Sequence, residues 1–439
     1  MGKLGFVNVC HPDYVSVDSL ALGEEAEAHL KKNGIELICA DGVVTDHRQA
    51  REVAHEFLSR RVDGVVIFYG AFVLSNVVMD LVCNLADTPL FFWGVPMLER
   101  DGRPIITGSY VAYSMFAGTL NRLKIPYDGM IAAPDGDDVI SRLHAFIRAA
   151  STKRRLKETR VGLVGYTSMS IYPGTFDHVL LRYLIGPEVE HIDSYSLINL
   201  ADKVEDKQIR EAAALLDNVA EMSEGVPAAM REKALRLFIA VRELCQIHDL
   251  QAITVKCQYE FSKEYGMIMC VPLSLLADQG MITGCEGDMP CLISTVILNY
   301  ISGQTAGYGD AINHEGNILK LSPCGFMPFS LGRKPKKIVK SEYPHFNGLL
   351  CSFVMRPEPV TLLRLVEDVG GFNLMYFTGQ GLPSALRGGV MPSLDIEIEG
   401  SIESLVRNYP GQHFAITYGD WSREIELLAQ LLRIPVQTI

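Results

Sequence analysis

The sequence predicts an α/β protein with two doubly wound parallel-sheet domains, followed by an antiparallel, barrel-like β domain with a C-terminal helix. Before Asp310, continuously apolar runs of strand length alternate with amphipathic segments, as in sheets covered on both faces. After Asp310 the segments are short, often alternate, and are separated by Gly and Pro, which indicates antiparallel structure. The 439 residues exceed one ordinary core, so we expect domains over residues 1–155, 156–305 and 306–439.

The first expected domain alternates strands with helices. Its strands are apolar runs that precede turn or helix signals: Leu4–Val9, Ile35–Ala40, Val62–Tyr69 and Pro89–Gly94. Its helices show helical spacing of apolar residues: Val17–Asn33, His47–Arg61, Ser75–Ala86 and Val139–Ala150. The stretch STKRRLKETR that follows is dense in charge, and we expect it to be a linker.

The second expected domain repeats this alternation. Its strands are Arg160–Gly165, Val189–Ile192, Ala252–Lys256 and Met281–Cys285, and its helices include Asp206–Val219 and Arg231–His248. The turn VGLVGYTSMS has no third glycine opening a helix, so it is not a dinucleotide fingerprint. A nucleotide-dependent oxidoreductase therefore ranks last among the possible functions.

Two acids, Glu286 and Asp310, flank one apolar segment. Asp288 can cap a helix over Cys291–Ile301, and a strand over Gln304–Tyr308 can then return beside Met281–Cys285. Such a strand–helix–strand unit would place both acids at the carboxyl edge of one parallel sheet, where open sheets bind ligands. Two carboxylates close together need a cation or a shared proton, and we expect a divalent metal.

The remaining segments predict the β domain. Its strands are Asn317–Leu321, Lys336–Val339, Leu349–Met355, Pro359–Glu367, Gly371–Gly379, Ser393–Ile402 and His413–Tyr418, and Ser422–Leu432 is the closing helix. His314 lies four residues after Asp310 and is a rival metal ligand, but HEGN is more typical of a hairpin turn.

Composition excludes several classes of partner. The net charge is −12 and no dense basic run is present, so we expect no nucleic acid. No apolar run approaches the roughly 20 residues of a membrane span, and no signal peptide is evident. Ten cysteines are scattered without a CxxC pair, which favours free thiols in a reducing compartment. We therefore expect a cytoplasmic protein.

Three motifs together resemble the L-fucose isomerase and L-arabinose isomerase superfamily. They are CEGDMP with Glu286, YGDAI with Asp310, and QHFAITYGD with His413 followed by LLAQLLRIPV. The resemblance implies an aldose–ketose isomerase that moves a proton between C1 and C2 of an open-chain sugar through a cis-enediol. It also implies that Glu286, Asp310 and His413 bind Mn²⁺, Mg²⁺ or another divalent ion, and that the two acids carry the proton.

The resemblance also implies a monosaccharide substrate and a trimer or hexamer with active sites at subunit interfaces. The chain is shorter than the fucose isomerases, and Gln412 stands where those enzymes have Asn. Gln412 is a candidate substrate contact. So are three polar residues at the end of an expected strand: Lys256, Gln258 and Tyr259. Trp93 either belongs to a core or covers a neighbouring subunit's site.

Each candidate has a structural alternative. Glu286 could stabilise a helix N-terminus, Asp310 could be a turn residue, and His413 could be a buried histidine on a strand. Asp288 fits a helix cap better than a metal ligand. A non-catalytic sugar-binding or regulatory protein is the second functional class, because two α/β lobes also build sugar receptors.

Overall fold

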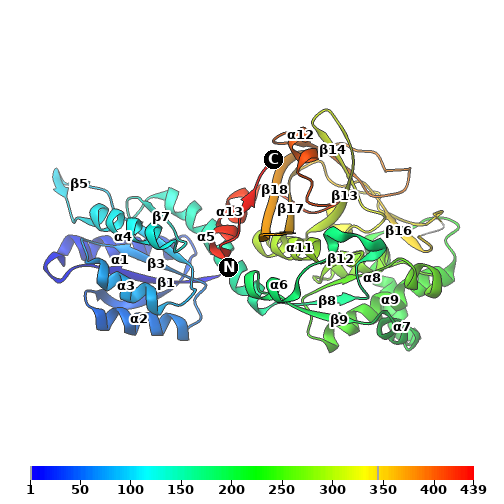
Figure 1. Cartoon of the computed structure of the whole chain (residues 1–439), viewed down its shortest axis with the longest axis horizontal. Coiled ribbons are helices and arrows are strands. Elements are labelled where there is room, and N and C mark those ends of the chain that lie inside the picture. Colours follow the sequence, from blue (N-terminus) through cyan, green and yellow to red (C-terminus); the bar gives the residue numbers. More distant parts are fainter. Residues whose placement is uncertain (1, 344–345) are drawn as a thin grey trace. The chain divides into compact units, whose positions relative to one another are not determined.

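A computed structural model describes residues 2–343 and 346–439, and within them the chain forms two compact units (Figure 1). The first unit runs up to Arg154 and includes Arg423–Arg433. The second unit consists of Arg155–Ser422 with Ile434–Ile439. The expected division of the second part at residue 305 stays a sequence prediction.

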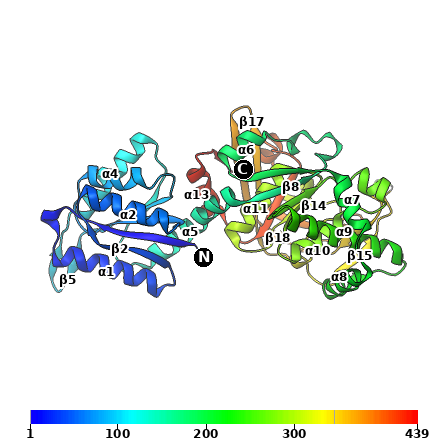
Figure 2. The ribbon, with the colours of Figure 1, turned by 90° about the horizontal axis from the view of Figure 1, so that it is seen from below.

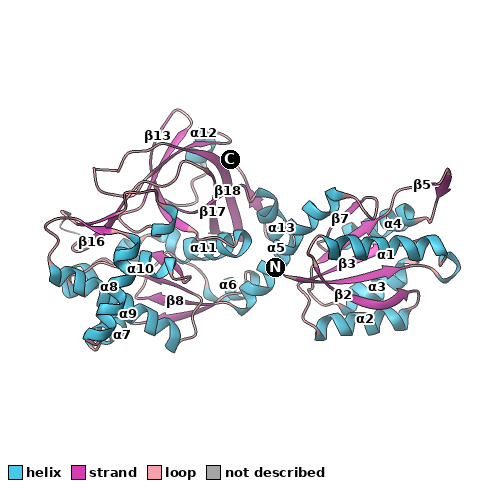
Figure 3. Ribbon diagram, turned by 180° about the vertical axis from the view of Figure 1, so that it is seen from behind, coloured by secondary structure: helices cyan, strands magenta, loops and turns pink. Residues whose placement is uncertain are grey.

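The first unit is a five-stranded parallel sheet in the order β2-β1-β3-β4-β7. The strands are β1 Lys3–Val9, β2 Glu36–Val44, β3 Gly64–Tyr69, β4 Leu90–Gly94 and β7 Asp128–Ile131, with a small hairpin of β5 Leu98–Arg100 and β6 Arg103–Ile105. The helices are α1 Val17–Lys32, α2 His47–Ser59, α3 Ser75–Asn84, α4 Ser109–Leu123, the first part of α5 Asp137–Glu158, and α13 Ser422–Leu432. Helices cover both faces of the sheet, which confirms the predicted parallel architecture (Figures 2 and 3).

The linker expected after Ala150 is wrong, because α5 continues unbroken to Glu158. The charged stretch lacks Gly and Pro and consists largely of good helix formers. Its charges are used in pairing: Lys153 Nζ lies 2.8 Å from Asp87 Oδ1, and the guanidinium of Arg155 lies 3.5 Å from the ring centre of Tyr300. Charge density indicated a solvated segment, but partners in the fold made a helix favourable.

The second unit begins with a four-stranded parallel sheet in the order β12-β11-β8-β9. Its strands are β8 Arg160–Val164, β9 Glu188–Ile192, β11 Ala252–Val255 and β12 Ile282–Cys285. Its helices are α6 His178–Leu184, α7 Ser194–Asp202, α8 Asp206–Val219, α9 Ala228–Ile247, α10 Cys270–Asp278 and α11 Met289–Ser302. The strands expected here from the sequence are confirmed, and β12 lies at one edge of the sheet.

A closed antiparallel barrel of six strands follows, in the order β17-β20-β13-β14-β19-β18, with β18 pairing back to β17. The strands are β13 Gly307–Glu315, β14 Ile318–Ser322, β17 Pro359–Asp368, β18 Gly371–Leu382, β19 Leu394–Ile398 and β20 His413–Tyr418, and β21 Val436–Gln437 joins β18. A separate sheet contains β10 Glu221–Met222, β15 Lys337–Lys340 and β16 Leu349–Ser352. The predicted barrel is confirmed, but the strands expected at Lys336–Val339 and Leu349–Met355 lie in this separate sheet and are not part of it. The strand expected at Ser393–Ile402 ends in helix α12, Ile402–Arg407.

The strand after α11 does not return to the parallel sheet as expected. β13 pairs antiparallel with β14 and β20 in the barrel. Its glycines explain the choice, because a Cβ on Gly307 would lie 2.7 Å from atoms of Leu331 and Met327, and one on Gly309 would lie 2.8 Å from Leu321. Alternate residues without side chains let this strand lie against large apolar side chains of β14 and of the segment that follows it.

We predict that Gly309→Ala lowers the free energy of unfolding by about 1–3 kcal/mol, because the added methyl group must displace Leu321. Gly118→Ala is the matched control. An added Cβ there meets nothing within 4 Å on helix α4, so this change should stabilise by about 0.5–1 kcal/mol. Chemical denaturation of both variants measures the difference. Equal stability of the two variants would contradict the packing described for β13.

Candidate functional site

Glu286 directly follows β12 and is held in an unusual backbone conformation. Its φ is 63° and that of Gly287 is 67°, so two consecutive residues lie in the left-handed region. The carbonyl of Glu286 accepts a 2.8 Å hydrogen bond from the amide of Ser168. Its Oε1 accepts a 3.2 Å hydrogen bond from Gln258 Nε2 and a 3.4 Å hydrogen bond from the thiol of Cys324. Backbone strain of this kind often accompanies functional residues.

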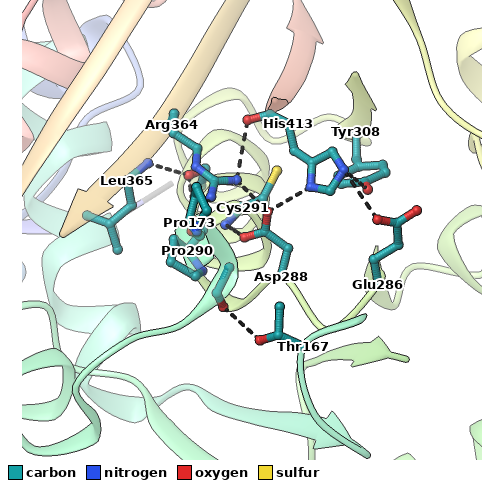
Figure 4. Close-up of polar contacts among 12 residues, drawn as sticks. Thr167, Pro173, Glu286, Asp288, Pro290, Cys291, Tyr308, Arg364, Leu365 and His413 are labelled. Atoms are coloured by element: carbon teal, nitrogen blue, oxygen red, sulfur yellow. Dashed lines mark hydrogen bonds and ion pairs between the residues drawn. The ribbon is translucent and has the colours of Figure 1, made fainter. Parts of the chain in front are cut away.

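His413 is the first residue of β20 and is completely buried. Its Nε2 lies 3.1 Å from Asp310 Oδ1 and 3.5 Å from Glu286 Oε2. The hydroxyl of Tyr308 lies 2.6 Å from the same nitrogen (Figure 4). Asp310 and His413 are direct cross-strand partners on β13 and β20, so the register of the barrel itself brings them together. The structure thus brings together all three residues that the sequence singled out as metal ligands.

Asp288 contacts the other ring nitrogen of the same histidine. Its Oδ2 accepts a 2.7 Å hydrogen bond from His413 Nδ1 and lies 2.7 Å from the guanidinium of Arg364 (Figure 4). Its Oδ1 accepts the 3.0 Å amide hydrogen bond of Cys291, which confirms the expected helix cap. Asp288 and Arg364 are 1% and 0% exposed, so each needs the other's charge.

Arg364 was not identified from the sequence, and the contacts of Asp288 with His413 and Arg364 were not predicted. The signal for Arg364 was available: a single arginine interrupts the apolar strand VTLLRLV, which occupies part of β17. A buried arginine in such a strand requires a buried acid as its partner. The helix cap explained one oxygen of Asp288 and left the second unassigned.

Burial and neighbouring charges shift the pKa values of three residues in the site. Burial opposes ionisation of Asp288, but Arg364 and His413 outweigh it and lower its pKa to about 2. Burial also disfavours charged His413, but hydrogen bonds to Asp288 and Asp310 raise its pKa to about 10. Burial raises the pKa of Glu286 well above its ordinary value, with a further contribution from Cys324. Glu286 therefore takes up a proton more readily than an ordinary glutamate.

The candidate substrate contacts lie in different environments. Gln258 is 3% exposed, and its Oε1 has no hydrogen-bond partner within the described residues. Lys256 Nζ lies 2.8 Å from Glu260 Oε1, whereas Tyr259 is 49% exposed. Gln412 accepts a 2.9 Å hydrogen bond from the amide of Ala311 through its backbone oxygen.

Trp93 lies in the core of the first unit. It is completely buried, and its indole N–H donates a 3.1 Å hydrogen bond to the carbonyl of Ala132. This placement matches the core alternative that the sequence left open. Trp93 is therefore not a candidate for substrate contact in the chain as it folds.

Two further expectations concerned free thiols and membrane-spanning segments. All ten cysteines are free thiols, and most of them are buried; Cys83 is exposed. Burial explains the raised pKa of several of these thiols, including Cys245, whose pKa is about 12. Within the described part of the chain, every helix is too short or too polar to cross a membrane.

The fit of a divalent cation depends on Glu286, Asp310 and His413. Across residues 2–343 and 346–439, no set of three His, Cys, Asp or Glu side chains is preformed as a metal cage. The donor types nevertheless fit: two carboxylates and an imidazole suit Mn²⁺ or Mg²⁺. The separations of 3.1 and 3.5 Å are also close to the roughly 3 Å between neighbouring ligands of an ion with bonds of about 2.1 Å.

Comparison with known proteins identifies related isomerases. No family model matches the chain. A sulfoquinovose isomerase from Alkalicoccus urumqiensis is 26% identical over 359 residues and one from Clostridium sp. (strain MSTE9) is 25% identical over 361 residues, each alignment covering 80% of both chains. A third, from Priestia aryabhattai, is 21% identical over 414 residues and 92% of both chains. These relatives confirm the prediction of an isomerase.

Solved structures add little to this relationship. Two solute-binding proteins of ABC transporters, from Burkholderia multivorans and Actinobacillus succinogenes, match 69% of this chain and 94% and 92% of their own. Their sequence identities are 14% and 10%, and both TM-scores are 0.18. At this TM-score the likeness assigns no shared fold.

We predict that metal-free protein loses stability between about pH 6.5 and pH 10. The pKa of His413 rises on folding from 6.5 to about 10, so its contribution is complete below pH 6.5 and disappears as pH passes through 10. Melting temperatures across this range should fall less in His413→Gln than in the unaltered protein. His314→Gln, on the exposed part of β13, should keep the full decline. Identical pH profiles for His413→Gln and the unaltered protein would contradict the described environment of His413.

Proposed function

We propose that the chain is a divalent-metal-dependent aldose–ketose isomerase. The observation that carries this proposal is the meeting of Glu286, Asp310 and His413 at one imidazole nitrogen, at the separations given above. The related sulfoquinovose isomerases support the same reaction class. The trimeric or hexameric assembly implied by the resemblance remains a prediction.

The cation would be held by His413 Nε2 and by one or both carboxylates. When bound there, a divalent ion supplies a Lewis acid that polarises the sugar carbonyl. Asp310 is the accessible member of the set, with 24% of its side chain exposed, whereas Glu286 and His413 are almost fully buried. The substrate therefore approaches from the side of Asp310.

Glu286 and Asp310 have the chemistry of a proton-transfer pair. An aldose–ketose isomerisation removes a proton from one of two neighbouring carbons and returns it to the other through a cis-enediol. The raised pKa of Glu286, caused by burial, brings its proton affinity closer to that required of a general base near neutral pH. Gln258 holds one oxygen of Glu286, which leaves Oε2 free to face the site.

The relatives support a proposal for the substrate, and two buried polar atoms are candidate contacts for it. Those relatives are named for sulfoquinovose, and we propose this anionic hexose as the first substrate to test. Gln258 Oε1 and the hydroxyl of Ser168 are buried and have no hydrogen-bond partner within the described residues, and both residues donate a hydrogen bond to Glu286 through other atoms. A buried polar atom without a partner is costly, so a sugar hydroxyl is a suitable partner for each.

We predict that Glu286→Gln lowers turnover at least about 100-fold, because it removes a proton carrier without changing the size of the side chain. The measurement is exchange of solvent deuterium into C2 of sulfoquinovose and a panel of aldoses with Mn²⁺ present. Glu315→Gln is the control, since this acid also lies in the second unit but on the surface, paired with Lys320. Full exchange in Glu286→Gln, or none with any sugar in the unaltered protein, would contradict the proposal.

We also predict that chelation of divalent ions abolishes turnover and that Mn²⁺ restores it, because the carbonyl then loses and regains its Lewis acid. Calorimetric titration of sulfoquinovose into metal-free and Mn²⁺-loaded protein accompanies the assay. Sugar binding that is equally tight without metal, together with no turnover in either form, would favour the non-catalytic sugar-binding alternative.

A further inference from the structure

We propose that Asp288 and Arg364 form a positioning pair that presents Nε2 of His413 to the cation. This role rests on the proposed function, because it assigns a task to the pair only if His413 is a metal ligand. Neither residue reaches the cation itself in this assignment. Both act through His413. Asp288 contacts its ring, and Arg364 contacts its backbone carbonyl and the carboxylate of Asp288.

The hydrogen bond to Asp288 determines which nitrogen of His413 is available. Nδ1 donates over 2.7 Å to Asp288 Oδ2, so the neutral ring carries its proton on Nδ1 and its lone pair on Nε2. Nε2 is the nitrogen that faces Asp310 and Glu286. In metal sites a carboxylate behind a ligating histidine fixes its tautomer and orientation in the same way.

Asp288 is itself fixed in three directions. Its Oδ1 accepts from the amide of Cys291 at 3.0 Å, at the start of α11. Its Oδ2 accepts from Arg364 at 2.7 Å as well as from His413. A side chain with both oxygens occupied in a fully buried position has little freedom to rotate. The ring of His413 therefore has a rigid partner.

Arg364 connects the same histidine to a second segment of the chain. Besides Asp288, its guanidinium donates to the carbonyl of His413 at 3.3 Å and to the carbonyl of Pro173 at 2.5 Å. Gly411 makes room for this group: its φ is 150°, and a Cβ there would lie 3.3 Å from the guanidinium. Arg364 thus holds both the backbone of His413 and the carboxylate that orients its ring.

Fold stability alone does not account for this network. A helix cap needs only one side-chain oxygen, which Ser, Thr or Asn also supplies. A buried ion pair is often no more stabilising than apolar residues of similar volume. The second oxygen of Asp288 and the buried charge of Arg364 are explained once the histidine must be held for a ligand.

Asp288→Asn is the decisive variant. An asparagine can still cap α11 through its oxygen, but its amide group then faces two other donors, His413 Nδ1 and Arg364. Mn²⁺ affinity, measured by calorimetry, should fall about 10–100-fold. Turnover should recover as Mn²⁺ is raised, with the KM for sugar unchanged at saturating metal. Asp177→Asn is the control, because Asp177 caps helix α6 outside the site and should keep full affinity.

The outcomes separate this role from the proposed function. If the unaltered protein binds no Mn²⁺, the metal-dependent function is wrong and the positioning role falls with it. If the unaltered protein binds Mn²⁺ and Asp288→Asn binds it equally tightly, only the positioning role is overturned. A loss in Asp288→Asn that excess Mn²⁺ does not restore also overturns it, since a general structural defect has that signature. Arg364→Lys, which keeps the buried charge, is the second variant if Asp288→Asn does not fold, and a reduced Mn²⁺ affinity supports the role.

Discussion

The imidazole of His413 is contacted by carboxylates on both of its nitrogens, and the arrangement of the second unit follows from this. Asp288 approaches Nδ1 from the start of α11, while Asp310 approaches Nε2 from the neighbouring barrel strand. Glu286, which follows the last residue of β12 in the parallel sheet, is the second carboxylate beside Nε2. The ring therefore lies where a parallel sheet, a helix N-terminus and a closed barrel meet, and each supplies one acid.

Much of this could be predicted from the sequence, because the deciding information is local. Apolar runs bounded by turn residues fixed β20 and α8 to the residue, and the apolar helix after Asp288 was expected with its cap. Sequence spacing also indicated that Glu286 and Asp310 would meet. The predicted route was different, since β13 joins the barrel and Asp310 reaches the site through its pairing with His413.

The parts that could not be predicted depend on partners distant in sequence. The destination of β13 is decided by the close packing of its glycines against Leu321 and other barrel side chains, which local propensity does not contain. The continuation of α5 through its charged end depends on acids and rings supplied by the fold. Arg364 is 76 positions from Asp288 along the chain, so its role became visible only when both were placed in space.

The close approach of Gly287 to Tyr166 constrains how this loop can vary. A Cβ on Gly287 would lie 2.3 Å from the carbonyl of Tyr166. The backbone that follows β12 therefore cannot change here unless the backbone that follows β8 moves as well. On that same loop the side chains of Tyr166, Met169 and Tyr172 are 61%, 50% and 82% exposed. Tyr172 could thus vary without disturbing the main chain beneath it, whereas Tyr166 also lies against Lys256, whose Nζ is 3.6 Å from its ring centre.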